Sequence, residues 1–320
     1  MRHISLAIAV AAGLWAATPG ESGAQTPVDY PHKVVTLVTH SSPGGGSDVF
    51  LRSMIKFLPK YINATFIIDN VQGGSGARAI SRLALAPADG SIFYATTPTY
   101  IYTSLLSKPQ HSFRDVEPLV NFFTDSEVVY TRADGPFKSL AEVIEKAKTA
   151  RGRWGAANPA SLERQAAEQL KRAAKVNAAV VSHEGGGDLM INVLNGTLDI
   201  GIGEIAELRP QIEAGKIRLL ATFDPKRMEA APDLPTVREL GFDVALEKFR
   251  GLAGPKGMPA AITKIWDEAV PKILADPEYQ KIYKGESLVP NFIPHAPYQG
   301  FIQTFSTTTE NFLKETGVLK

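Results

Sequence analysis

The sequence predicts an α/β protein of two lobes, each lobe a mainly parallel sheet flanked by helices. Three observations lead to this prediction. The chain has 320 residues, a length that favours two domains over one. Strand and helix signals alternate along it, as they do where helices cover a mostly parallel sheet. Glycine-rich loops join strands to helices in both halves of the chain.

The N-terminus has the three-part pattern of a secretory signal peptide. Arg2 and His3 precede an apolar run from Ile4 to Ala17, and Ser22-Gly23-Ala24 fits the small-x-small rule for cleavage. The apolar run is shorter than the roughly 20 residues that a membrane-spanning helix needs. The sequence therefore predicts a signal peptide over residues 1–24 and export of the mature chain. The chain has no Cys, so lipidation of the N-terminus is excluded.

The first half of the mature chain alternates short β-branched runs with helical runs. The expected strands are Val34–Thr39, Thr65–Asp69 and Ile92–Thr96, and the expected helices are Asp48–Leu58 and Ala77–Ala86. Glycine-rich loops lie between them, at 41–47 and at 73–76.

The same alternation starts again further along the chain. The expected strands there are Val128–Thr131, Arg153–Ala156, Ala178–Val181, Ile200–Gly203, Ile217–Phe223 and Phe249–Gly254. The expected helices are Leu140–Ala150, Ser161–Ala174, Asp188–Asn195, Leu208–Ala214, Pro259–Ala275, Pro277–Lys284 and Pro297–Thr316. Gly196 follows one of them as a stop signal, and Pro259 opens another at its first turn.

Composition excludes several classes of protein. Without Cys, neither a disulfide framework nor a thiolate metal site can form. The formal net charge is +1, which lacks the basic excess that nucleic-acid binding uses. After the signal, no apolar run is long enough to cross a membrane, so the mature protein is expected to be soluble.

Motifs for cofactors, metals and catalysis are incomplete. Gly44-Gly45-Gly46-Ser47-Asp48-Val49 lacks the third glycine of a dinucleotide-binding loop, and no phosphate-binding loop is present. Gly73–Ala77 lacks the last glycine of a nucleophile elbow. Ser53-Met54-Ile55-Lys56 has no Lys-Thr-Gly partner, and the His residues form no pair with ligand spacing. We therefore expect no cofactor, no metal and no catalytic residue.

The glycine loops instead favour an anion. Glycine lets the backbone approach a ligand closely, and the helix that follows offers free N–H groups and the positive end of its dipole. Any one such loop can equally be a simple tight turn. Two of them in separate halves of the chain indicate a cleft between lobes.

Several short segments, in order along the chain, resemble the Bug family, the periplasmic receptors of tripartite tricarboxylate transporters. These segments are Val35–Val38, Pro43–Asp48, Asp69-Asn70 with Gly73–Gly76, Ala88–Gly90, Glu184–Gly187, Gly215–Ala221, Pro232–Thr236 and Arg250–Pro255. Each is weak alone, but their order and spacing cover nearly the whole mature chain.

The resemblance implies a type II-like, two-lobe periplasmic-binding-protein fold that closes around a ligand like a Venus flytrap. Residues 25–123 and 224–320 would form lobe 1, and residues 124–223 would form lobe 2, with chain crossings near Phe122–Asp125 and Phe223–Asp224. A ligand carboxylate would be held between loops of both lobes. Carried over residue by residue, the expected contacts are Ser41, Ser42, Gly45, Gly46 and Ser47 in lobe 1, and Ala157, Asn158, Ser161, Gly186 and Asp188 in lobe 2. Thr97 and Glu204 are added because each follows a strand that ends at the cleft.

The chain departs from the family pattern where the ligand is expected. His40-Ser41-Ser42 stands where the family usually has Pro-Phe-Ala, and His183-Glu184 stands where it usually has Tyr-Lys. The helix from Ser161 also lacks the usual His. We therefore expect a more polar pocket than is usual. If Glu184 faced the cleft, it would repel a second carboxylate of a ligand.

The function that follows is capture of a small organic acid and its delivery to membrane transporter subunits in transient contact with a monomeric receptor. Two alternatives remain open at this point. The chain could be an orphan sensor that feeds a signal-transduction system. It could also be a secreted hydrolase, although no serine with a partner base can be assembled from the sequence.

Overall fold

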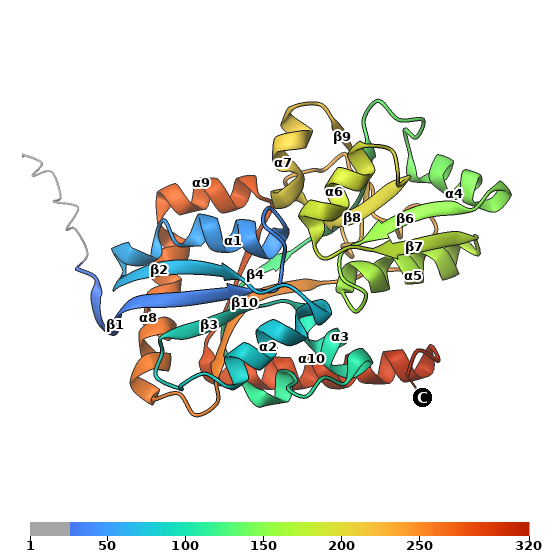
Figure 1. The fold of residues 1–320 in the computed structure, drawn as a ribbon. Helices are drawn as coiled ribbons and strands as arrows, with labels where there is room; N and C mark the ends of the chain where they lie inside the picture. The colour runs from blue at the N-terminus through green and yellow to red at the C-terminus, as the bar shows by residue number, and fades with distance from the viewer. Residues whose placement is uncertain (1–25, 320) are drawn as a thin grey trace, which may run out of the picture.

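The computed structural model describes residues 26–319, and the predicted signal peptide lies outside them. The described chain forms two sheets, each covered by helices, which sit side by side as two lobes (Figure 1). This arrangement confirms the α/β, two-lobe fold. None of the helices in the described part is both long and apolar enough to cross a membrane.

The first lobe is built on a six-stranded sheet in the order β11-β4-β10-β3-β1-β2. Its strands are β1 (Val28–Thr39), β2 (Ile62–Asn70), β3 (Ile92–Thr96), β4 (Val116–Asp125), β10 (Lys248–Pro255) and β11 (Val289–Ile293). Its helices are α1 (Gly46–Met54), α2 (Ala77–Ala84), α3 (Pro98–Ser107), α8 (Ala260–Ala275), α9 (Pro277–Gly285) and α10 (His295–Glu315). Three short 3₁₀ turns, at Leu58–Lys60, Gly74–Gly76 and Phe113–Asp115, connect these elements.

Each face of this sheet has its own hydrophobic core. Alternate residues of a strand point to opposite faces, so Leu37 and Val38 of β1 belong to different cores. Leu37 packs with side chains of α1, α8 and α9, including Trp266. Val38 packs with side chains of α2, α3 and α10, including Tyr298. Because both faces of the sheet are buried, a ligand site is expected at the ends of its strands.

The second lobe is built on a five-stranded sheet in the order β7-β6-β8-β5-β9. Its strands are β5 (Glu127–Arg132), β6 (Gly152–Ala156), β7 (Ala178–Ser182), β8 (Ile200–Glu204) and β9 (Ile217–Thr222). Its helices are α4 (Leu140–Thr149), α5 (Leu162–Ala174), α6 (Gly186–Leu194) and α7 (Ile205–Glu213). Helices α4 and α5 pack around Trp154 on one face, and α6 and α7 pack around Tyr130 on the other.

The sheets are mixed rather than mainly parallel. In the first sheet β1 pairs parallel with β2 and β3, whereas β10 is antiparallel to β3 and β4, and β11 is antiparallel to β4. In the second sheet β6 pairs parallel with β7 and β8, but β5 is antiparallel to β8 and β9. Strands β5, β10 and β11 run against the strands of the βα units, and β5 and β10 begin directly after the two passages of the chain between lobes.

The chain passes from the first sheet to the second between Asp125 and Glu127, and it returns between Thr222 and Lys248. The intervening segment 223–247 contains no helix or strand. Its side chains Val237 and Val244 pack into the core of the second lobe, and Thr236 bridges to Thr222 of β9. The division of the chain into lobes stays a proposal, and on this packing we place its second boundary near residue 247 instead of residue 223.

Candidate functional site

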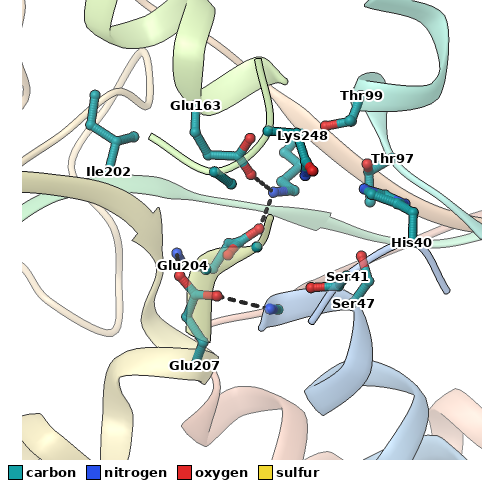
Figure 2. Close-up of a pocket in the computed structure, with 15 residues that line it drawn as sticks. His40, Ser41, Ser47, Thr97, Thr99, Glu163, Ile202, Glu204, Glu207 and Lys248 are labelled. Carbon is teal, nitrogen blue, oxygen red and sulfur yellow. Dashed lines mark hydrogen bonds and ion pairs between the residues drawn. The ribbon is translucent and has the colours of Figure 1, made fainter. Parts of the chain in front are cut away.

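A small polar cavity lies between the two lobes, where strands of both sheets end (Figure 2). Its volume is about 20 Å³, room for about one water molecule. Its lining residues come from both lobes: His40, Ser41, Gly46, Ser47, Thr97, Thr99, Ala157, Asn158, Glu163, Gly185, Gly186, Ile202, Glu204, Glu207 and Lys248. The lobes are thus closed on each other, and a ligand of several heavy atoms needs them to move apart.

The topology explains why these residues meet. His40 follows β1, Thr97 follows β3, Ala157 follows β6 and Glu204 ends β8. In open α/β sheets the crevice beyond the carboxyl ends of parallel strands is the usual ligand site. Helices α1, α3, α5, α6 and α7 all begin near this crevice, so their N-terminal N–H groups face it.

Lys248 is the centre of a buried ion cluster. Its Nζ donates to Glu127 at 2.7 Å, to Glu163 at 2.8 Å and to Glu204, and its side chain is 2% exposed. An ammonium group has three N–H donors, so these three carboxylates use all of them. Glu127 and Glu204 come from the second sheet and Glu163 from α5, so the cluster joins β10 of the first lobe to the second lobe.

Arg250 extends this cluster two residues further along β10. Its Nε donates to Asp125, and its Nη2 forms ion pairs with Asp125 and, at 3.1 Å, with Glu204. Its Nη1 lies 3.4 Å from Ser47 Oγ. Arg250 is 1% exposed and does not line the cavity. Its charge therefore balances carboxylates behind the cavity wall.

The carboxylates of this cluster are not electrostatically equivalent. Burial raises the pKa of Asp125 and Glu127, although Arg250 and Lys248 respectively oppose the shift. Glu204 lies between both cations; although its burial acts in the opposite direction, Lys248 and Arg250 lower its pKa to about 2. Glu204 is therefore an ionised partner of both cations, while Asp125 and Glu127 hold protons more readily than usual carboxyl groups.

Glu207 bridges the lobes by a hydrogen bond. Its Oε2 accepts a hydrogen bond from the N–H of Gly46, at the first turn of α1, over 2.8 Å (Figure 2). Glu207 itself belongs to the first turn of α7 in the second lobe, and it is 3% exposed. Burial and the neighbouring charge of Glu204 raise its pKa well above the usual range. The N–H of Gly46, which was predicted to contact a ligand, therefore donates to a side chain of the protein instead.

His40 also lines the cavity, but its ring belongs to a local pair. Its Nδ1 lies 2.6 Å from the hydroxyl of Tyr94, and both residues are buried. Burial lowers the pKa of His40 to about 4, so the imidazole is neutral near pH 7. The hydroxyls of Ser41 and Ser47 are not its hydrogen-bond partners.

The model of the tripartite tricarboxylate transporter family receptor matches residues 50–318 of this chain. The chain belongs to this receptor family. A Cupriavidus necator protein is 24% identical over 318 residues, covering 98% of this chain and 96% of that protein. Protein BugT of Bordetella pertussis is 22% identical, covering 95% of this chain and 96% of its own length. The resemblance to the Bug family is confirmed.

Several solved structures share the fold of this chain. The periplasmic binding protein BugD superposes with a TM-score of 0.84 at 23% identity, over 91% of this chain and all of that chain. A Rhodopseudomonas palustris protein, solved with adipate, gives 0.83 at 24% identity over 90% of this chain and 98% of that chain. MatC from the same species, with bound malate, gives 0.77 at 23% identity over 89% of this chain and 99% of that chain.

The structure brings most of the predicted contact residues of this receptor to the cavity. Those that line it are Ser41, Gly46, Ser47, Thr97, Ala157, Asn158, Gly186 and Glu204. The other four, Ser42, Gly45, Ser161 and Asp188, lie outside the lining. Contact with a ligand stays a prediction both for the residues that line the cavity and for those that do not.

Local structure explains where these four residues lie. Ser42 and Gly45 pack where the first glycine loop meets Gly185 and Gly186 of the other lobe. Ser161 caps α5, since its hydroxyl accepts a hydrogen bond from Arg164 N at 3.0 Å. Asp188 is exposed in the first turn of α6.

The positions that depart from the family pattern divide into two kinds. His40 and Ser41 line the cavity. His183 does not line it, and Glu184 is exposed to solvent. Glu184 therefore does not supply the repulsion that a cleft-facing carboxylate would exert on a ligand. Other carboxylates do face the cleft, namely Glu163, Glu204 and Glu207.

Sequence reasoning placed Glu204 at the site but missed the other charged residues, namely Asp125, Glu127, Glu163, Glu207, Lys248 and Arg250. Lys248 and Arg250 are two residues apart, as are Asp125 and Glu127, so each pair stands on one face of an extended segment. Of these four, Arg250 stands inside a predicted strand, Phe249–Gly254, where a buried charge needs a partner. The signal was present in the sequence, but it does not say which carboxylate meets which cation.

Three of the carboxylates are arranged closely enough to hold a metal ion. Oxygens of Glu127, Glu163 and Glu204 all lie within 4.8 Å of one another. Lys248 Nζ donates to each of the three residues, so it takes the position that a cation would need. The geometry is that of a buried salt-bridge cluster built around an ammonium group.

Proposed function

We propose that this protein is a periplasmic solute receptor that captures a small organic acid between its lobes and delivers it to a tripartite tricarboxylate-type transporter. The observation that carries the proposal is the polar cavity enclosed by both lobes of a chain that belongs to this receptor family. Two neighbours in fold were solved with carboxylates, one with adipate and one with malate.

Several features of the site support binding rather than catalysis. Ser41 and Ser47 line the cavity, but the one imidazole beside them, His40, pairs with Tyr94. A nucleophilic serine needs a base within hydrogen-bond reach. The lining instead offers hydroxyl groups, the Asn158 amide and helix N-termini, which hold a ligand without reacting with it.

Closure of the lobes is the proposed working step. A ligand reaches the site only when the lobes separate, because the closed cavity has room for about one water molecule. A ligand that contacts both lobes binds the closed form better than the open form and shifts the population towards it. The closed, ligand-filled monomer is then the form that the transporter subunits would contact transiently.

A thermal-shift screen of organic acids tests ligand capture. We expect at least one acid to raise the melting temperature, increasingly with its concentration, because a ligand that binds only the native state stabilises it by RT ln(1 + [L]/Kd). The variant Asn158→Ala should reduce the shift, whereas Asn63→Ala, on the exposed part of β2, should leave it unchanged. If no acid shifts the melting temperature, or if a bound acid is chemically converted, the proposal is wrong.

Uptake in cells tests delivery. Deletion of the gene should abolish uptake of the radiolabelled acid found in the screen, and export of the protein with its own leader should restore it. A chain lacking residues 1–24 should not restore uptake, because it would not leave the cytoplasm. Normal uptake in the deletion strain would contradict a transport role.

A further inference from the structure

The cavity offers positive charge only through a lysine that is already fully paired. Among the lining residues that the structure describes, Lys248 is the one cationic side chain, and its three N–H donors go to Glu127, Glu163 and Glu204. A ligand carboxylate could reach Lys248 only by displacing one of these carboxylates. An anion would therefore compete with the protein's own acids for the same donor.

The N-terminus of α1 is likewise occupied by a protein carboxyl group. Glu207 accepts the N–H of Gly46, and glycine at position 186 makes room for it, since a Cβ there would overlap with the Glu207 carboxyl. The position that best suits an anion in the first lobe is thus filled from within the protein. The remaining wall facing it is acidic, because Glu163 and Glu204 also line the cavity.

One carboxylate oxygen in this wall has no partner. Glu163 Oε1 accepts from Lys248, but Glu163 Oε2 makes no hydrogen bond within the described part of the chain. The residue is 5% exposed, and it lines the cavity. A buried carboxylate oxygen without a donor is costly, and a donor from the ligand would remove that cost.

We propose that the ligand of this receptor carries an ammonium group, which donates to Glu163 Oε2, in addition to a carboxylate. This inference rests on the proposed function and narrows its substrate class from small organic acids to small amino acids in the broad sense. Glu127 and Glu207 hold protons readily, but three further carboxyl groups (Asp125, Glu163 and Glu204) still face two cations in and around the cavity. A positive group on the ligand therefore improves the charge balance, and a purely anionic ligand worsens it.

The carboxylate of such a ligand has a separate place on the cavity wall. Thr97 and Thr99 stand at the start of α3, and Asn158 precedes α5; all three line the cavity. Hydroxyl, amide and helix N-terminal N–H groups suit a carboxylate and carry no full charge. The two ends of the ligand are thereby distinguished, with the ammonium at Glu163 and the carboxylate at the helix starts.

Matched pairs of ligands test the proposal on the unmodified protein. Each pair is an acid and the same acid with an α-amino group: propionate and alanine, succinate and aspartate, glutarate and glutamate, adipate and 2-aminoadipate. Calorimetric titration at pH 7 should give an affinity at least about tenfold higher for the amino member of the best pair, the value of one hydrogen bond to a charged group. Equal or tighter binding of the plain acid overturns the inference but leaves the proposed function standing.

The diamine putrescine, tested in parallel, separates failure of the two proposals. Putrescine binding as tightly as the best amino acid would support the ammonium site and contradict an organic-acid receptor. Absence of binding by every compound in the panel counts against both proposals.

A charge-neutral variant assigns the ammonium to one residue. Glu163→Gln should weaken binding of the best amino acid about 10- to 100-fold and should leave the matching plain acid unchanged or bound more tightly. Glu145→Gln, on the outer surface of α4, is the control and should change neither. A loss that is equal for both members of the pair would show that Glu163 acts only through the fold.

Discussion

Lys248 connects the two lobes and also lines the cavity, because its ammonium group, on β10 of the first lobe, donates to three carboxyl groups of the second lobe. A buried salt bridge contributes little net stability compared with apolar residues of the same shape, because both charges lose their hydration. Removing one partner is different, since the remaining charges are then buried without compensation. Loss of Lys248 is therefore expected to destabilise the protein, because it would leave three buried carboxyl groups, with oxygens within 4.8 Å of one another, without their cation.

Lys248→Met should lower the free energy of unfolding by about 3–5 kcal/mol at pH 7, the usual cost of breaking a buried ion pair. The loss should shrink towards pH 5, because protonation neutralises the carboxylates left behind. Urea denaturation at both pH values measures it. Lys264→Met, an exposed lysine of α8, is the control and should change stability by less than about 0.5 kcal/mol. A loss for Lys248→Met as small as the control's would mean that the cluster is solvated in solution.

Glu207 should favour the closed form even without ligand. Glu207→Ala removes the acceptor for Gly46 N, so the balance between closed and open forms should shift towards the open form by about fivefold, the value of one hydrogen bond of about 1 kcal/mol. Small-angle X-ray scattering of the ligand-free protein should show a larger radius of gyration. Glu207→Gln keeps an acceptor oxygen and should stay closer to the parent protein. Identical radii for all three proteins would contradict this role.

At the scale of elements, the N-terminus of α6 decides how closely the lobes approach. A Cβ at Gly187 would lie 2.7 Å from the carbonyl oxygen of Pro43 in the other lobe, whereas a Cβ at Gly300, inside α10, would meet nothing within 4 Å. Gly187 is not among the glycines with positive φ, so close packing and not backbone conformation requires glycine there.

Gly187→Ala should therefore weaken ligand binding by hindering closure, with little effect on the fold of either lobe. The expected signs are a larger radius of gyration in the presence of ligand and at least a tenfold weaker affinity. Gly300→Ala is the matched control and should raise stability by up to about 1 kcal/mol through helix propensity, with unchanged binding. Equal affinities for the two variants would show that the lobes tolerate a methyl group at this contact.

Most elements of the fold could be predicted from local sequence, and two of the exceptions share a cause. The strand Ile92–Thr96 was predicted with its observed ends, and all predicted helices are present with ends shifted by a few residues. Helix α3, by contrast, is buried along nearly all its length, so it shows no amphipathic period. Strand β4 is also buried on both faces, and its Pro118 suggests a break; the structure places Pro118 at an irregularity in the pairing with β10. Strand β11 was not predicted either.

The site was predictable to the extent that it follows from strand ends. Gly46, Ser47, Thr97 and Ala157 lie where a strand-to-helix turn places them, and the glycine pattern indicates such turns directly. Lys248 and Glu163 reach the cavity through tertiary packing of segments 85 residues apart in the chain. Local pattern contains no information about that pairing, so the acidic character of the site emerged only from the structure.

At the scale of the whole molecule, the closed lobes also contact each other outside the cavity. Arg209 of α7 donates to the carbonyl of Gly285, at the end of α9 in the other lobe. Next to it, burial raises the pKa of Glu286 to about 7, and the charge of Asp125 adds to this shift while Arg250 opposes it. Glu286 is therefore a titrating group close to a contact between the lobes, in the pH range of ordinary measurements.

Glu286 should make the protein less stable as pH rises from about 4.5 to 7. Its carboxyl binds a proton more tightly in the folded chain than in the unfolded chain, and stability falls with pH wherever the folded state holds more protons. His40, whose pKa is lowered to about 4, acts in the opposite direction below pH 6.5, so the effect of Glu286 must be measured as the difference in stability between the parent protein and a Glu286 variant.

Glu286→Gln resembles the protonated carboxyl, so it should match the parent protein near pH 4.5 and exceed its free energy of unfolding by about 1–3 kcal/mol at pH 8. Urea denaturation across this range measures the difference. Glu278→Gln, at an exposed position of α9, should show a difference that does not depend on pH in this window. If the Glu286→Gln curve runs parallel to the parent curve from pH 4.5 to 8, the carboxyl is ionised throughout and the contact beside Arg209 is open to water.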